Sequence, residues 1–117
     1  GYDGGAGDFQ MGPLTFMLNY PDHCVLYRFI PRSITETDME LVWYVNGDAV
    51  EGVDYNKEDL TWLWHETSLE DEFIISRNSE GVNSHFFEPG PYHPEHEATC
   101  YEFITWYLKA LSQVKVS

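Results

Sequence analysis

The spacing of apolar residues changes about halfway along the chain, and this change restricts the possible folds more than any other sequence feature. Before residue 47 the apolar residues form short runs rich in β-branched and aromatic side chains, which are typical of strands. These runs predict three strands, at residues 14–20, 23–30 and 39–46, joined as an antiparallel meander. The middle run is apolar at both odd and even positions, which indicates a strand covered on both faces.

From residue 57 onward the apolar positions recur every three or four residues, as on one face of an amphipathic helix. Glu58 and Asp59 suit the positive end of a helix dipole, and Gly81 is a typical helix stop. A second helix is expected to begin near Pro94 and to end near Ser112. Strands followed by helices predict an α+β fold, in which an antiparallel sheet packs against the long helix.

Residues 1–12 are rich in glycine and hold few apolar anchors, so they are expected to form a flexible lead-in to the folded part at residues 13–117. The chain carries a net charge of −14, which repels the phosphates of nucleic acids and anionic membrane surfaces. No apolar run approaches the roughly 20 residues that a membrane span requires. The two cysteines are too few for a disulfide framework. The sequence therefore predicts a cytoplasmic protein that binds neither nucleic acid nor membrane.

Asp71 is the first candidate for a functional residue, because it lies on the apolar stripe of the predicted long helix. A carboxylate on such a stripe must be paired, protonated or bound to a metal, since burying it alone is costly. The structural alternative is that Asp71 faces a cleft or an arginine such as Arg28 or Arg77, and periodicity alone favours this alternative. Glu70 does not share a site with Asp71, because adjacent helical residues diverge by about 100°.

His93, His96 and Glu97 form a second candidate, since two histidines and a carboxylate on one helical face can bind zinc or iron. The alternative is that these side chains only cover a solvated helix start, which the lack of further ligands favours. His65 lies six residues before Asp71 and is expected to point away from it. Signatures of hydrolases, kinases and zinc ribbons are absent from the sequence.

Five spaced segments resemble the C-terminal part of Rieske oxygenase large subunits, in the same order, and the resemblance covers about residues 23–110. They are residues 49–55 (AVEGVDY), 60–64 (LTWLW), 70–71 (ED), 77–84 (RNSEGVNS) and 88–92 (EPGPY). In that family the aspartate of a Glu-Asp pair on a long helix is the carboxylate of a site for mononuclear Fe(II) that also uses two histidines. The resemblance therefore implies that Asp71 is a metal ligand.

The resemblance also implies a helix-grip fold and an oxidoreductase that hydroxylates or demethylates an organic, for example aromatic, substrate. The parent enzyme would activate dioxygen at Fe(II), with electrons that pass from an NAD(P)H-linked reductase or ferredoxin through a 2Fe-2S Rieske cluster. It is expected to be a homo-oligomer. The family's Asp-x-x-His-x-x-x-x-His segment and its Cys/His cluster motif are absent here. The chain is therefore expected to be a fragment that is inactive alone, because a facial triad needs three protein ligands.

Two other classes of function remain open on the sequence. The chain could be a stand-alone binding module for small molecules, with an apolar pocket between sheet and helix. It could also be an acidic protein-interaction domain whose aromatic residues form an interface. The iron content of the full-length gene product separates the oxygenase from both alternatives.

Overall fold

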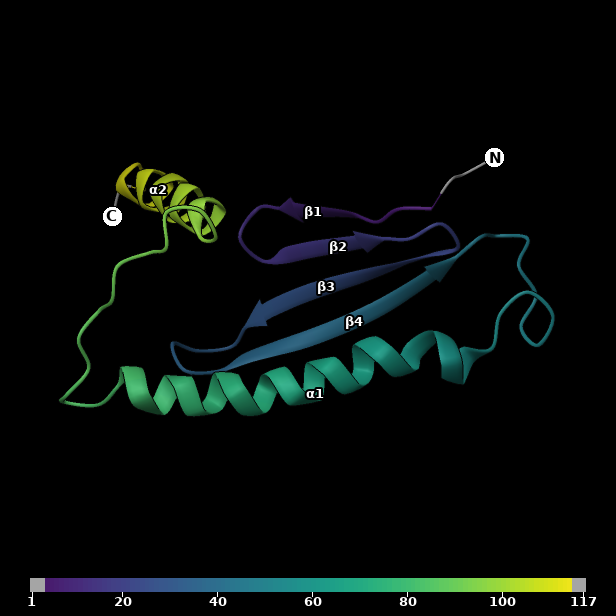
Figure 1. The fold of residues 1–117 in the computed structure, drawn as a ribbon, viewed down its shortest axis with the longest axis horizontal. Helices are drawn as coiled ribbons and strands as arrows, with labels where there is room; N and C mark the ends of the chain where they lie inside the picture. Colours follow the sequence, from purple (N-terminus) through teal and green to yellow (C-terminus); the bar gives the residue numbers. More distant parts are fainter. Residues whose placement is uncertain (1–3, 115–117) are drawn as a thin grey trace. The chain divides into compact units, whose positions relative to one another are not determined.

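The computed structural model describes residues 4–114, which form a four-stranded sheet and two helices (Figure 1). The elements in chain order are β1 (Gly7–Met11), β2 (Thr15–Asn19), β3 (His23–Pro31), β4 (Thr37–Val45), α1 (Lys57–Val82) and α2 (Ala98–Ser112). The chain divides into two compact units after Arg77, within α1, so the sheet and most of α1 belong to the first unit and α2 to the second. This order of elements confirms the predicted α+β class.

The sheet is an antiparallel meander in the order β1-β2-β3-β4, so that each strand pairs with its neighbour in the sequence. The three predicted strands are present as β2, β3 and β4, with ends that differ from the prediction by at most two residues. Tight connections between consecutive strands produce this topology, because antiparallel strands can be joined by short turns.

Strand β1 was not predicted, because it falls within the segment 1–12 that was expected to be a flexible lead-in. It pairs along its whole length with β2, from Gly7 opposite Asn19 to Met11 opposite Thr15. Backbone hydrogen bonds rather than buried side chains hold this strand, since Phe9 is 60% exposed. A strand without a buried face has no hydrophobic periodicity, and for this reason the sequence pattern did not reveal it.

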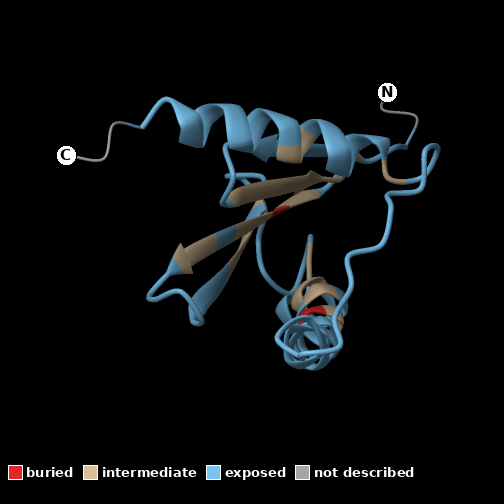
Figure 2. Ribbon diagram, turned by 90° about the vertical axis from the view of Figure 1, so that its left-hand side faces the viewer, coloured by how far each residue is buried: buried red, intermediate tan, exposed pale blue. Residues whose placement is uncertain are grey.

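One face of the sheet is turned toward α1, and the strand register identifies its residues. Val25 of β3 lies opposite Leu18 of β2 and Trp43 of β4, and all three therefore point to the same side. Val25 is completely buried, and Ser68 of α1 is 5% exposed. Figure 2 marks these two positions as buried, one in the sheet and one in the helix. The core of the first unit is therefore the layer between this face and α1.

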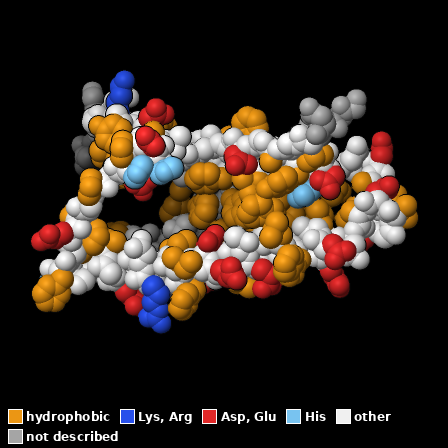
Figure 3. Space-filling view, in the orientation of Figure 1, with side chains coloured by type: hydrophobic (Ala, Val, Ile, Leu, Met, Phe, Trp, Pro, Cys, Tyr) orange, Lys and Arg blue, Asp and Glu red, His pale blue; other side chains and the backbone are white. Residues whose placement is uncertain are grey.

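The opposite face of the sheet stays largely uncovered within the first unit. Tyr44, which points to that side, is 51% exposed, and Met11 of β1 is 52% exposed. On the side nearest α1, hydrophobic side chains gather over the middle of the sheet, as Figure 3 shows. Exposed apolar surface of this extent is typical of a protein surface that contacts further protein or a ligand.

Helix α1 begins at Lys57, as predicted, because Asn56 caps it. The Asn56 Oδ1 atom accepts hydrogen bonds from the backbone N–H groups of Glu58 at 2.8 Å and Asp59 at 3.3 Å. Helix α1 ends at Val82, one residue after the predicted stop. None of the helices in residues 4–114 is both long enough and apolar enough to cross a membrane.

Helix α2 begins at Ala98, four residues later than predicted. The segment before it forms a turn in which His93 Nδ1 accepts hydrogen bonds from the backbone N–H groups of Glu95 and His96. This side-chain cap competes with helix formation around Pro94, and the helix consequently starts only after the turn.

Candidate functional site

Asp71 lies on the side of α1 that faces the sheet, next to the one buried position of the helix. Ser68, one turn earlier, has its Oγ atom 3.4 Å from the Tyr27 Oη atom on β3. The same Oγ atom donates to the backbone carbonyl of Trp64 at 2.6 Å. Asp71 is close enough to Tyr27 for its negative charge to act on the phenol. Asp71 therefore follows Ser68 on the side of α1 that approaches Tyr27 of β3.

The carboxylate of Asp71 is exposed, and within residues 4–114 no hydrogen bond or ion pair holds it. Of the two arginines that were considered as its partners, Arg28 pairs instead with Glu40, with 2.6 Å between Nη2 and Oε2. The guanidinium carbon of Arg77 lies 5.5 Å from the centre of the Phe73 ring. Asp71 thus projects from the sheet-facing stripe with its oxygen atoms accessible.

The environment of Tyr27 disfavours ionisation of its phenol. Burial raises the pKa of Tyr27 above its ordinary value of 10.0, and the negative charge of Asp71 raises it further, although the hydrogen bond with Ser68 acts in the opposite direction. Tyr20 behaves similarly, because burial and then the charge of Asp8 raise the pKa of its phenol. Both phenols are therefore neutral hydrogen-bonding groups at physiological pH.

Alkaline pH is expected to destabilise the first unit through Tyr27. A group whose pKa is raised on folding contributes stability below its unfolded pKa and loses it as the pH rises through the folded pKa. The free energy of unfolding should therefore fall above about pH 10, and Tyr27→Phe should make that fall shallower because phenylalanine cannot ionise. Urea unfolding between about pH 8 and about pH 11 measures the two slopes. Equal slopes for the original and the Tyr27→Phe chain would contradict this role.

Three aromatic side chains gather beside Ser68: Tyr27 from β3, Trp64 from α1, and Tyr20 directly after β2. The Tyr20 and Trp64 rings lie 6.1 Å apart at an interplanar angle of 31°. The Tyr27 ring meets Trp64 edge-on, at 6.3 Å and 88°. The sequence did not predict this cluster. Its only local signal is that Trp64 precedes Asp71 by seven residues, two helical turns, on the same stripe.

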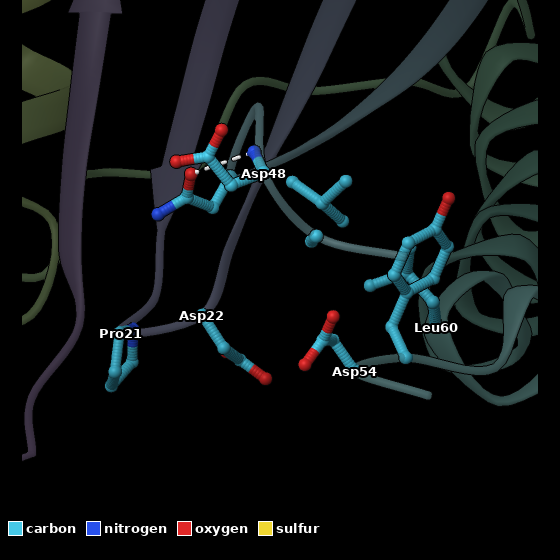
Figure 4. A pocket seen from close by; sticks show the side chains of 9 residues that line it. Pro21, Asp22, Asp48, Asp54 and Leu60 are labelled. Carbon is cyan, nitrogen blue, oxygen red and sulfur yellow. Dashed lines mark hydrogen bonds between the residues drawn. The ribbon is translucent and has the colours of Figure 1, made fainter. Parts of the chain in front are cut away.

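Two hollows open along the edge of this layer. One, of about 490 Å³, lies between β4 and α1 and is lined by residues that include Leu41, Trp43 and Ser68. The other, of about 440 Å³, lies at the start of α1 and includes Tyr20 and Trp64. A third hollow adjoins the second one, and Figure 4 shows Asp22 and Asp54 pointing toward one another across it.

The second predicted candidate, His93, His96 and Glu97, forms a local turn. The two imidazole rings stack with centroids 4.5 Å apart, and the Glu97 carboxylate accepts a hydrogen bond from the backbone N–H of His93. Because the His93 Nδ1 atom already accepts two backbone hydrogen bonds, the cluster acts as a cap before α2. This arrangement agrees with the structural alternative for these residues.

The residues present do not form an iron site by themselves. Within residues 4–114 there is no group of three His, Cys, Asp or Glu side chains that could hold a metal ion. A facial triad for non-heme Fe(II) takes two histidines and one carboxylate. Asp71 offers one carboxylate, and His65 lines the hollow between β4 and α1.

Comparison with known proteins identifies the family. Residues 2–113 match the ring hydroxylating alpha subunit family, in its catalytic domain. The chain belongs to this family. The match covers nearly all of the chain and confirms the resemblance to Rieske oxygenase large subunits.

Two relatives carry the name glycine betaine monooxygenase oxygenase subunit. The protein of Chromohalobacter salexigens is 36% identical over 86 residues, which are 74% of this chain and 19% of that protein. The protein of Pseudomonas aeruginosa, strain UCBPP-PA14, is 37% identical over 90 residues, 77% of this chain and 21% of that protein. The chain therefore spans about a fifth of the length of these relatives.

Proposed function

We propose that this chain is the C-terminal part of the catalytic domain of a Rieske-type oxygenase subunit and that Asp71 is the carboxylate ligand of a mononuclear Fe(II). The position of Asp71 carries the proposal: in a member of this family it projects from the sheet-facing stripe of α1, beside Ser68 and Tyr27, with no partner on its carboxylate within the described residues. Residues 13–117 would belong to this domain, and so would β1, because β1 is part of the same sheet.

The complete subunit would oxidise a small organic substrate with dioxygen. Two histidines from the part of the subunit outside this sequence would complete the iron site. Bound iron supplies the activation of dioxygen, and a 2Fe-2S cluster fed by a reductase or ferredoxin supplies the electrons. Residues of this chain would form one wall of the substrate pocket, between the sheet and α1. The names of the relatives favour hydroxylation or demethylation of a small quaternary ammonium compound such as glycine betaine. Electrons from NAD(P)H imply a cytoplasmic location, and we expect a homo-oligomer.

A stand-alone binding module is the second candidate, and one observation favours it. The indole N–H of Trp43 is buried without a hydrogen-bond partner among residues 4–114, and Trp43 lines the hollow between β4 and α1. An acceptor atom of a ligand in that hollow would satisfy this donor. A small molecule that remains bound to the isolated chain through purification would support this candidate.

Iron analysis tests the proposed function directly. The complete subunit is expected to hold about one iron atom beyond those of its cluster, whereas the isolated chain should hold far less than one. The reason is that a single carboxylate is too few ligands for tight binding. If the isolated chain retained about one iron atom after dialysis against a chelator, Asp71 would not be one ligand of a three-ligand set, and the proposal would be wrong.

A further inference from the structure

The hollow at the start of α1 combines ring faces with carboxylates. We call it the aromatic hollow. Its volume is about 440 Å³, within the usual range of small-molecule sites. Its side chains include three aromatic and three acidic residues and no lysine or arginine. These six residues are Tyr20, Tyr55, Trp64, Asp22, Asp54 and Asp59.

The ring faces and the carboxylates favour the same kind of ligand. The face of an aromatic ring carries negative potential, and a cation within about 6 Å of a Trp or Tyr centroid is attracted to it. The rings of Tyr20 and Trp64 both line the hollow, with centroids 6.1 Å apart and planes tilted by 31°, and one face of Tyr20 is stacked on the His23 ring. The hydrogen bond between His23 and Asp22, 2.8 Å long, lowers the pKa of the Asp22 carboxyl and keeps it charged. Both features attract a positive charge.

The geometry excludes a bare metal ion as the occupant. No three acidic or other ligating side chains of residues 4–114 converge closely enough to hold one. The Asp54 Oδ2 atom is already engaged, because it accepts a hydrogen bond from the backbone N–H of Val50 at 2.9 Å. A quaternary ammonium group needs no such ligands, since it donates no hydrogen bond and is held by ring faces and diffuse negative charge.

We propose that the aromatic hollow binds the quaternary ammonium head group of a small organic cation, with the rings of Trp64 and Tyr20 as its main contacts. The inference rests on the proposed function, because the bound head group would then lie near the metal ligand. Trp64 and Asp71 are seven residues apart on the same face of α1, which is about 10 Å along the helix axis. The head group would thus lie about two helical turns from Asp71 along α1.

A pair of ligands tests the role of the charge without any mutation. Glycine betaine and 3,3-dimethylbutanoate have the same shape and the same carboxylate, but a neutral carbon replaces the ammonium nitrogen in the second. Calorimetric titration of the complete, iron-loaded subunit should give at least about tenfold tighter binding of glycine betaine. Equal affinities, or no detectable binding of glycine betaine, would overturn the proposal.

Variants of the complete subunit test the ring faces. Trp64→Leu and Tyr20→Leu should each weaken binding of glycine betaine about tenfold, whereas Tyr20→Phe should bind like the original because it keeps the ring. Trp62→Leu is the matched control for Trp64, because Trp62 is 63% exposed and does not line the aromatic hollow. If Trp64→Leu fails to fold, the affinities of Tyr20→Leu and Tyr20→Phe for glycine betaine show whether an aromatic ring is needed for binding. Unchanged affinity in Tyr20→Leu would overturn the assignment.

The outcomes separate this inference from the proposed function. If the subunit holds iron and oxidises glycine betaine with the same KM in Trp64→Leu and Tyr20→Leu, the aromatic hollow is not the head-group site and the proposed function stands. If the Asp71→Ala subunit retains iron, the assignment of Asp71 as an iron ligand is wrong. If that subunit still binds glycine betaine about tenfold more tightly than 3,3-dimethylbutanoate, the assignment of the aromatic hollow as the head-group site is supported.

Discussion

Replacing Asp71 with alanine in the complete subunit is expected to abolish iron retention and turnover while the fold stays intact. Loss of hydrogen-bonded groups behind a metal ligand already weakens metal binding by about 10-fold to 100-fold, so loss of a ligand itself should weaken it by more than about 100-fold. Asp71 is exposed on α1 and no hydrogen bond or ion pair within residues 4–114 holds it, so the helix does not depend on it. The stability of the metal-free protein should change little, because the exposed carboxylate makes no contact that the fold requires.

Glu70→Ala is the matched control for this prediction. Its side chain leaves α1 about 100° away from that of Asp71 and should not reach the metal. Metal analysis, circular dichroism and turnover of both variants give the comparison. Iron and activity that survive in Asp71→Ala but are lost in Glu70→Ala would show that the wrong residue of the pair has been assigned.

Val25→Asp is expected to have the largest effect on folding. Val25 is completely buried in β3, between its neighbours Leu18 and Trp43 and under α1. Arg28 on the same strand cannot neutralise a carboxylate there, because it is paired with Glu40 on the other face of the sheet. An unpaired buried charge costs more than about 3 kcal/mol, which is a large part of the stability of a small unit.

Val53→Asp provides the control, because the chemical change is identical and Val53 is 80% exposed. Its effect on the free energy of unfolding should stay within about 0.5 kcal/mol. Urea unfolding followed by tryptophan fluorescence measures both variants. A Val25→Asp chain as stable as the Val53→Asp chain would mean that the layer between sheet and α1 is not the core.

Local patterns in the sequence were sufficient for most of the first unit. Strands β2, β3 and β4 were predictable because their apolar runs are short and rich in β-branched and aromatic residues. The start of α1 was predictable because the period changes there, and Asn56 adds a cap. The side of the helix on which Asp71 lies follows from the same period, and the matching segments around it identified the family.

Only the tertiary structure decided the remaining features, since each depends on contacts that leave no periodic trace. Strand β1 is held by the backbone of β2, and hydrogen bonds between backbones are independent of side-chain pattern. The late start of α2 follows from the His93 cap, a choice between two local hydrogen-bonding arrangements that composition does not determine. The aromatic hollow joins Tyr20 to Trp64 across 44 positions of sequence, and only the packing of α1 on the sheet brings these rings within 6.1 Å.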